Sequence, residues 1–209
     1  MHSHLLLLIL FALLVGFIAV EVWNNFDKAK VAVASEASAL RAVVLLAETF
    51  YALIDRHIEE AINKEWPAMA QHRATLSTLR AAHLIELLHD TLTLKPADDS
   101  QRIAQPEMMK AIQTALDARR QRIVVSQSAV GSVKWAGILL QALCTLIAIA
   151  MVHSDNRLSC AIAMTLFATG VALSLLLIAA YSRPFAGEIS VRPDLLKQVI
   201  TSGQPSSNP

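Results

Sequence analysis

The stretch that decides the fold runs from Leu158 to Tyr181 and reads LSCAIAMTLFATGVALSLLLIAAY, twenty-four residues without a charge. A helix of this length measures about 36 Å, enough to cross a hydrocarbon core of about 30 Å. Two more uncharged blocks precede it, Leu5 to Val20 with sixteen residues and Trp135 to Val152 with eighteen. The sequence therefore predicts three transmembrane helices, at residues 5–23, 134–152 and 158–182.

The composition agrees with a membrane protein. Hydrophobic residues make up 55% of the chain and charged residues 17%, against roughly 45–50% and about 25% in a soluble domain. The formal net charge is +1, and no basic stripe with interleaved aromatics is present, so nucleic acid is not an expected partner. Cys144 and Cys160 fall in apolar blocks and would lie about 12 Å apart along an antiparallel pair, too far for a disulfide.

The basic residues predict an orientation. Fourteen of the eighteen Lys and Arg residues lie between Glu21 and Lys134, whereas the short turn after Val152 has only Arg157 and the N-terminus has none. By the positive-inside rule, the segment between the first two spans and the C-terminus are cytoplasmic, in the inner or plasma membrane. The first block has no Lys or Arg ahead of it and no cleavage site at its end, which favours a retained anchor over a signal peptide.

Residues 24–133 are expected to form a helical cytoplasmic domain. Apolar residues follow each other there at steps of four and three, a heptad seam of Val33, Ala37, Leu40, Val44, Ala47, Tyr51, Ile54, Ile58 and Ala61. The charges predicted to lie on the opposite face are Glu36, Arg41, Glu48, Asp55 and Glu59. Such a seam requires a partner, either a helical hairpin within the chain or a second copy in an oligomer.

The helix limits follow from proline, glycine and loop residues. No Pro or Gly separates Val20 from Trp66, which predicts one unbroken helix closed by Glu65-Trp66-Pro67. A second amphipathic helix is expected at residues 68–94, a loop at 95–100, a third helix at 106–128 and a break at Gly131. The predicted fold is an all-α membrane protein with an antiparallel, coiled-coil-like helical domain between the first and second transmembrane helices.

Enzyme chemistry finds no support in the sequence. It contains no glycine-rich phosphate loop, no nucleophile elbow and no cofactor fingerprint. The histidines are scattered without metal-ligand spacing, and Asp98-Asp99 lacks the spaced oxygens of a calcium loop. Glu59, Glu60 and Glu65 are expected to be surface charges. No catalytic, cofactor-binding or metal site is predicted.

The predicted spans carry few polar side chains, namely Gln141, Thr145, Thr165, Thr169 and Ser174. They serve either helix packing, through interhelical hydrogen bonds beside small residues, or the lining of a weakly polar pore. No charge lies within a span, which argues against an active transporter.

Residues 183–200 follow the third span as a separate motif. Arg183-Pro184-Phe185-Ala186-Gly187 should end the helix at the interface, and a short amphipathic helix should start near Pro193. Residues 201–209 are rich in Ser and Pro and are predicted to be a disordered tail.

Four short motifs, in this order along the chain, resemble the bestrophin-like family of bacterial membrane proteins, a domain of unknown function. They contain Trp23 after the first span, the Glu65-Trp66-Pro67 elbow, Arg119, Arg120 and Arg122 in one helix, and Arg183, Pro184, Phe185 and Gly187 after the third span. These residues are interpreted as structural. The resemblance also implies a further hydrophobic segment ahead of the first block, so the chain is either a short variant or starts late.

The family name implies kinship to bestrophins, which are oligomeric anion channels. The resemblance thus predicts a homo-oligomer in the lipid bilayer that passes anions. The alternative is a non-conducting scaffold or signal-relay protein that uses its helical domain. Three spans cannot enclose a pore alone, so conduction would require an oligomer.

Overall fold

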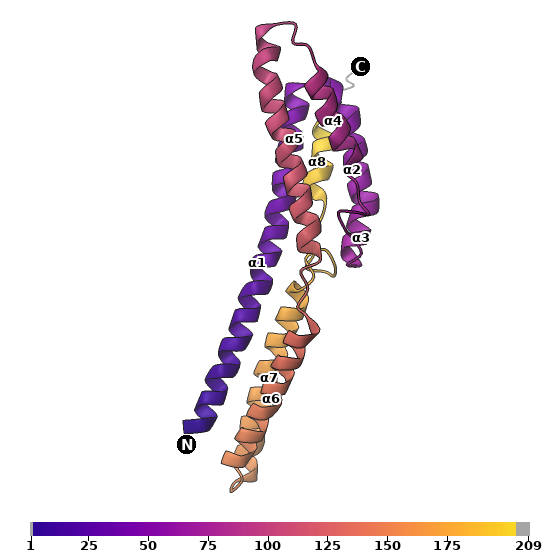
Figure 1. Ribbon diagram of the computed structural model, residues 1–209. Coiled ribbons are helices and arrows are strands. Elements are labelled where there is room, and N and C mark those ends of the chain that lie inside the picture. Colours follow the sequence, from indigo (N-terminus) through magenta and orange to yellow (C-terminus); the bar gives the residue numbers. More distant parts are fainter. Residues whose placement is uncertain (1, 204–209) are drawn as a thin grey trace. The chain divides into compact units, whose positions relative to one another are not determined.

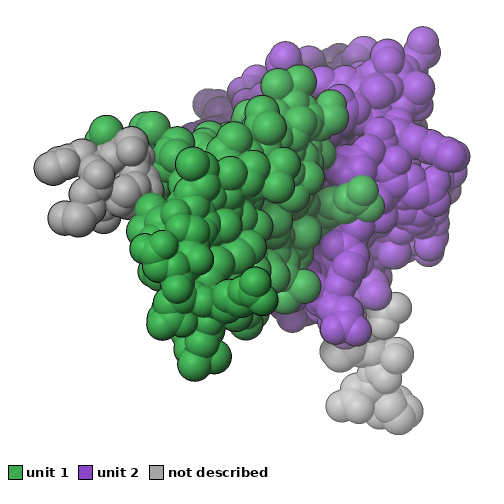
Figure 2. All heavy atoms as spheres, turned by 90° about the horizontal axis from the view of Figure 1, so that it is seen from below, with its two compact units in different colours: residues 1–26, 129–183 green, residues 27–128, 184–209 purple. Residues whose placement is uncertain are grey.

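A computed structural model describes residues 2–203, and every regular element among them is a helix (Figure 1). The predicted all-α class is thereby confirmed. Three helices are long and apolar enough to cross a membrane: α1 (His2–Leu46), α6 (Ser132–Val152) and α7 (Arg157–Tyr181). The chain divides into two compact units, coloured separately in Figure 2. Unit 1 comprises Met1–Phe26 and Ala129–Arg183, and unit 2 comprises Asp27–Ser128 and Pro184–Pro209.

Unit 1 contains the start of α1 together with the hairpin of α6 and α7. Asn156 begins α7, because its side-chain oxygen accepts the backbone N–H groups of Leu158 and Ser159 at 3.0 and 3.2 Å. A small apolar core joins the three helices through Phe11, Ile18, Val22, Ile138, Ala142 and Ile178. Most other apolar side chains point outward, with Phe17 71% and Leu166 70% exposed, as expected for helices surrounded by lipid.

Only the first part of α1 can lie in hydrocarbon. Its 45 residues extend over about 67 Å, more than twice the thickness of a bilayer core. The uncharged run ends at Val20, and Asp27, Lys28 and Lys30 follow within three turns. The membrane-crossing part therefore ends near Trp23, and the remainder of α1 lies in unit 2, outside the membrane.

Unit 2 combines the second part of α1 with several shorter helices. The further elements are η1 (Glu48–Phe50), α2 (Tyr51–Glu60), η2 (Ala61–Glu65), α3 (Trp66–Ala70), α4 (Ala82–Thr93), α5 (Asp99–Ser126) and α8 (Asp194–Gly203). Helix α2 contacts α4 and α8, and α4 contacts α5 (Figure 1). The Tyr51 hydroxyl donates to the Ile200 carbonyl at 2.7 Å and so fastens α8 to α2.

The prediction of an unbroken helix from the first span to Trp66 is wrong. The chain leaves helical geometry at Ala47, where φ is −156° and ψ is 99°, and reverses direction into α2. The reversal brings His57 of α2 to Glu36 of α1. The seam residues Leu40 and Val44 of α1 and Ile54 and Ile58 of α2 are buried. This burial outweighs the local preference to continue a helix through a sequence without Pro or Gly.

Pro67 does not close the helix either. Trp66 keeps helical angles, φ −58° and ψ −49°, and the chain stays helical to Ala70. The turn before it, η2, is a π-helix in which the Trp66 N–H reaches the Ala61 carbonyl five residues back. A wider turn at this place accommodates the proline, which in an ordinary helix interior would clash with the preceding turn.

Other expected limits also differ. The predicted helix at 68–94 is instead the end of α3, a loop at 71–81 and α4. Helix α5 begins seven residues before Pro106 because Asp98 caps it, accepting the Gln101 N–H at 2.7 Å. Helix α8 continues to Gly203, so residues 201–203 are helical and not part of a disordered tail. The rest of that predicted tail lies outside the described residues.

Candidate functional site

A buried charge cluster lies at the centre of unit 2, made of Glu36, His57, Glu65, Arg119 and Arg122. Each of these residues is at most 4% exposed, and Glu36 and Arg122 are 0% exposed. They come from α1, α2, η2 and α5, so the cluster joins four elements that are distant in sequence.

Arg122 connects the two carboxylates of the cluster. Its Nε donates to Glu36 Oε2 at 2.8 Å, and its Nη2 donates to Glu36 Oε1 at 3.0 Å and to Glu65 Oε2 at 2.8 Å. This fork-to-carboxylate arrangement is the strongest pairing available to an arginine. On the other side of Glu36, His57 Nε2 donates to Oε1 at 3.0 Å, since an ionised carboxylate can only accept.

Arg119 holds the second carboxylate. Its Nε donates to Glu65 Oε1 at 2.8 Å, its Nη2 also bonds that oxygen, and the same Nη2 reaches the Leu79 carbonyl at 2.8 Å. Glu65 therefore lies between both guanidinium groups. Two carboxylates face two guanidinium groups, so the cluster is formally neutral when His57 is neutral. No charge is left over to bind an anion, and the cluster holds the four elements together.

The electrostatics of the cluster keep it ionised. Burial opposes the charge on Glu36, but the charge of Arg122 and the hydrogen bonds from His57 and Arg122 outweigh it and lower the pKa of Glu36 to about 2. Burial likewise opposes the charge on Arg122, and Glu36 and Glu65 reverse the effect, so that the pKa of Arg122 is raised. The ion pair between Glu36 and Arg122 therefore persists across the physiological pH range.

Trp66 covers the cluster and ties the C-terminal motif to it. Its ring lies 4.6 Å from Arg122 Cζ, a cation–π distance. Its Nε1–H donates to the Val191 carbonyl at 3.1 Å, and Phe185 meets it edge-on at 5.7 Å between ring centroids. The turn that brings Phe185 there includes Gly187, whose φ of +88° favours glycine.

We expect Trp66→Phe to lower the free energy of unfolding by about 1–3 kcal/mol, because the buried Val191 carbonyl loses its donor. The released C-terminal segment should also be cut faster by trypsin after Lys197. Limited proteolysis followed by mass spectrometry measures this rate. Trp135→Phe, in unit 1, is the matched control and should leave the cleavage rate unchanged. Equal cleavage rates in the two variants would mean that Trp66 does not hold the C-terminal segment in place.

The structure corrects two predictions about charges. Glu36 was expected on the exposed face of the seam and Glu65 on the surface, yet both are buried ligands of arginine. Of the other motif residues, Arg120, Pro67 and Arg183 are exposed, and Pro184 is buried. Among residues 2–203, no group of three or more His, Cys, Asp or Glu is arranged to hold a metal.

A signal for the cluster was present in the sequence. In α5 the buried positions Met108, Ile112, Ala115, Arg119 and Arg122 recur at helical spacing, so both arginines lie on the apolar stripe. A charge on such a stripe needs a buried partner of opposite charge. Which residue of the chain is that partner can be known only from the fold.

The polar residues of the spans do not converge on one place. Gln141 is half-buried, Thr145 is buried, Ser174 is half-buried, and Thr165 and Thr169 are exposed. Each hydroxyl donates to the carbonyl four residues earlier in its own helix, at 2.8 or 2.9 Å. Such bonds satisfy a hydroxyl within its own helix. Gln141 has a side-chain amide without a hydrogen-bond partner among the described residues.

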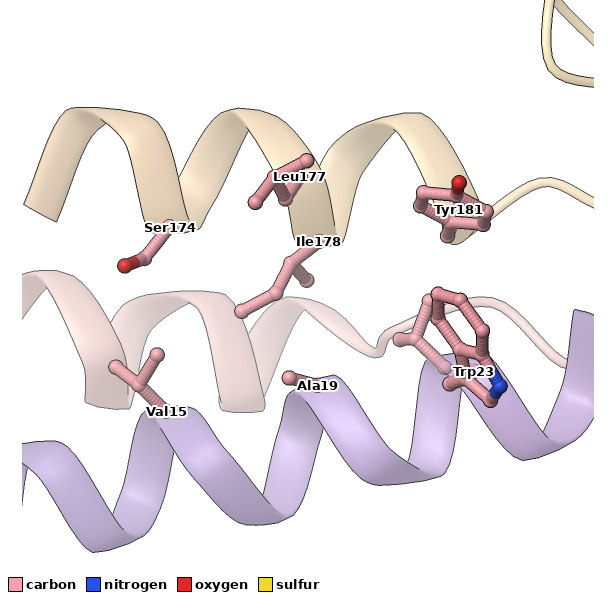
Figure 3. Close-up of a pocket in the computed structure, with 8 residues that line it drawn as sticks. Val15, Ala19, Trp23, Ser174, Leu177, Ile178 and Tyr181 are labelled. Carbon is pink, nitrogen blue, oxygen red and sulfur yellow. The ribbon is translucent and has the colours of Figure 1, made fainter.

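Unit 1 also contains an apolar groove between α1 and α7, with a volume of about 220 Å³ (Figure 3). It is lined by Val15, Ala19, Val22, Trp23, Ser174, Leu177, Ile178 and Tyr181. Trp23 and Tyr181 close one end, with ring centroids 5.3 Å apart.

Comparison with known proteins assigns the family. No curated protein and no solved structure matches the chain. The model of the Bestrophin-like domain matches residues 7–196, which include both units, the buried charge cluster and the C-terminal motif. This confirms the resemblance found in the sequence. The chain is a membrane protein that belongs to the Bestrophin-like domain family.

Proposed function

We propose that this protein is an oligomeric membrane channel for anions, and that unit 2 lies on the cytoplasmic side. The observation that carries the proposal is the family match over residues 7–196, because the kinship implied by its name is with oligomeric anion channels. Family membership concerns the fold, so ion conduction by the membrane-spanning helices is tested directly.

The packing of unit 1 supports an oligomer. The core between its three helices is apolar and contains Phe11, Ile18, Ile138 and Ile178, so it offers no polar path for water or ions within one copy. The outward faces of α6 and α7 expose Leu140, Leu166 and Leu176 to more than 60% each. A pore would therefore form between copies, with parts of these faces turned toward it.

An anion path needs hydrogen-bond donors. The Thr165 and Thr169 hydroxyls already donate to their own backbone and would have to turn away from it to meet an anion. The Gln141 amide carries two N–H donors that no described residue occupies. Gln141 is therefore the residue that we assign to the pore.

The proposed orientation takes account of the buried arginines. Arg119 and Arg122 are paired with Glu36 and Glu65 inside unit 2, so they do not act as free flanking charges. The basic residues near the spans that stay exposed are Lys28, Lys30, Arg120, Lys134 and Arg183. All five belong to the proposed cytoplasmic side, so the excess of Lys and Arg on that side is kept when the two buried arginines are left out.

The test is ion flux in proteoliposomes, using purified full-length protein whose oligomeric mass has been measured. Chloride flux should exceed potassium flux. A defined oligomer that passes no ion under any gradient would contradict the proposal.

Gln141→Leu should lower anion flux about tenfold, since loss of a hydrogen bond to a charged group costs about 1.5 kcal/mol or more and each 1.4 kcal/mol is a factor of ten. Gln141→Glu should lower the ratio of anion to cation permeability. Gln113→Leu, which removes an exposed amide from α5, is the control for the substitution. Unchanged flux in both Gln141 variants would exclude this residue from the pore.

The alternative is a signal relay without conduction. The observation in its favour is that α1 is one continuous helix of 45 residues, which contributes Phe11 and Ile18 to the core of unit 1 and Glu36 to the buried charge cluster. A shift of such a helix in the membrane would act on the cluster. A folded oligomer without flux, whose Glu36→Gln variant loses binding of a cytoplasmic partner, would favour this reading.

A further inference from the structure

The groove between α1 and α7 has dimensions that fit one hydrocarbon chain. From Val15 to Trp23 it follows eight residues of α1, or about 12 Å. This is close to one leaflet of a hydrocarbon core, about 15 Å. Apart from the Trp23 indole, the Ser174 hydroxyl and the Tyr181 phenol, its walls are hydrocarbon side chains, which suit an acyl chain.

The two ends of the groove differ in polarity. The tilted rings of Trp23 and Tyr181 meet at one end (Figure 3), and both residue types prefer the interface between hydrocarbon and water. Glu21, two residues before Trp23, forms an exposed ion pair with Lys134, which places charge at the same level. The other end, at Val15 and Ser174, has no charged residue nearby in sequence. The groove thus runs from the interface into the hydrocarbon.

An arginine without an acidic partner among the described residues follows the interfacial end of the groove in the sequence. Arg183 follows Tyr181 by two residues, at most about 7 Å of backbone, and its side chain is exposed. Among residues 2–203 no carboxylate pairs with it, and the Tyr181 hydroxyl makes no hydrogen bond. Lys134 is different, because Glu21 neutralises it. A free guanidinium and a free hydroxyl beside an apolar groove match a phosphate joined to a hydrocarbon chain.

We propose that this groove is a binding site for one anionic phospholipid, with an acyl chain between α1 and α7 and its phosphate on Arg183. Ser174 lies half-buried in the wall, its hydroxyl bonded to the Gly170 carbonyl at 2.9 Å, so it offers the chain no unsatisfied polar atom. The site requires only that unit 1 crosses the bilayer. Its failure and that of the channel proposal are therefore separate outcomes.

The experiment is native mass spectrometry of the delipidated full-length protein, titrated with dioleoylphosphatidylglycerol or dioleoylphosphatidylcholine. The wild type should hold one phosphatidylglycerol per chain and bind it about fivefold more tightly than phosphatidylcholine, the preference expected from one basic residue. Ser174→Leu and, from the other wall, Val15→Phe should each fill the groove and weaken binding at least tenfold. Arg183→Gln should abolish the fivefold preference and keep binding of the chain.

Matched controls lie on the same helix. Ala168→Leu adds the same side chain at an exposed position of α7 outside the groove, and Arg157→Gln removes an arginine at the opposite end of α7. Both should bind as the wild type does. Two results would overturn the proposal: groove-filling variants that bind lipid as well as Ala168→Leu does, or a headgroup preference that survives Arg183→Gln. If Ser174→Leu dissociates the oligomer but still binds lipid, the groove is occupied by a side chain of a second copy and not by lipid.

Discussion

Arg122→Leu is expected to lower the free energy of unfolding by about 3–5 kcal/mol, the cost of breaking a buried ion pair by removing one partner. The side chain is 0% exposed and donates to Glu36 and Glu65. Without it Glu36 keeps only His57 as a partner, in a place that water does not reach. Unfolding followed by circular dichroism in mild detergent measures the loss as a lower melting temperature.

The control is two residues away on the same helix. Arg120 is exposed, and Arg120→Leu should change stability by no more than about 0.5 kcal/mol. Equal losses in the two variants would show that arginine in α5 matters for a reason other than the buried pairs.

The double variant Glu36→Leu with Arg122→Leu makes the test sharper. It removes one carboxylate and one guanidinium together and leaves Glu65 paired with Arg119. Because the remaining charges again balance, the double variant should be more stable than Arg122→Leu alone. A double variant that is less stable than both single variants would mean that the shape of these side chains, and not their charge, stabilises unit 2.

The membrane helices could be predicted from the sequence because the bilayer itself imposes their length and composition. Leu158 to Tyr181 carries no charge, and α7 covers this run together with Arg157 before it. The family resemblance is confirmed by the family match over residues 7–196. Two of the short motifs behind it, at Trp66 and Phe185, meet in the fold.

The buried charge cluster could not be predicted in the same way. Burial of Glu36 depends on the reversal at Ala47, which brings His57 to it, and on α5, which brings Arg122 from 86 residues away. None of these contacts is local, so no spacing rule within one helix reveals them. The arginines on the apolar stripe of α5 indicated buried acidic partners. The domain has thirteen acidic residues, and the sequence does not show which two of them pair with these arginines.

Acid should remove the stabilising effect of Glu36. Its pKa is about 2 in the folded protein, against an ordinary value of 4.5, because Arg122 and His57 favour the charged form. A lowered pKa means that the contribution is fully present above about pH 4.5 and is lost as the pH falls toward 2. The shift corresponds to about 3 kcal/mol of folding free energy. Melting temperatures between pH 6 and pH 2.5 should therefore fall steeply below pH 4.5.

Other carboxylates also titrate in this range, so the comparison between variants decides the result. Glu36→Gln removes the group and should be less stable at neutral pH, but its melting temperature should change less between pH 4.5 and 2.5 than that of the wild type. Glu60 offers a matched control: its pKa is also lowered, chiefly by the hydrogen bond from Lys64, but it lies near the surface. Glu60→Gln should keep the wild-type slope, because solvent screens an exposed pair. The same slope in all three proteins would mean that Glu36 is not ionised in the folded state, and that Arg122 owes its place to packing against Trp66.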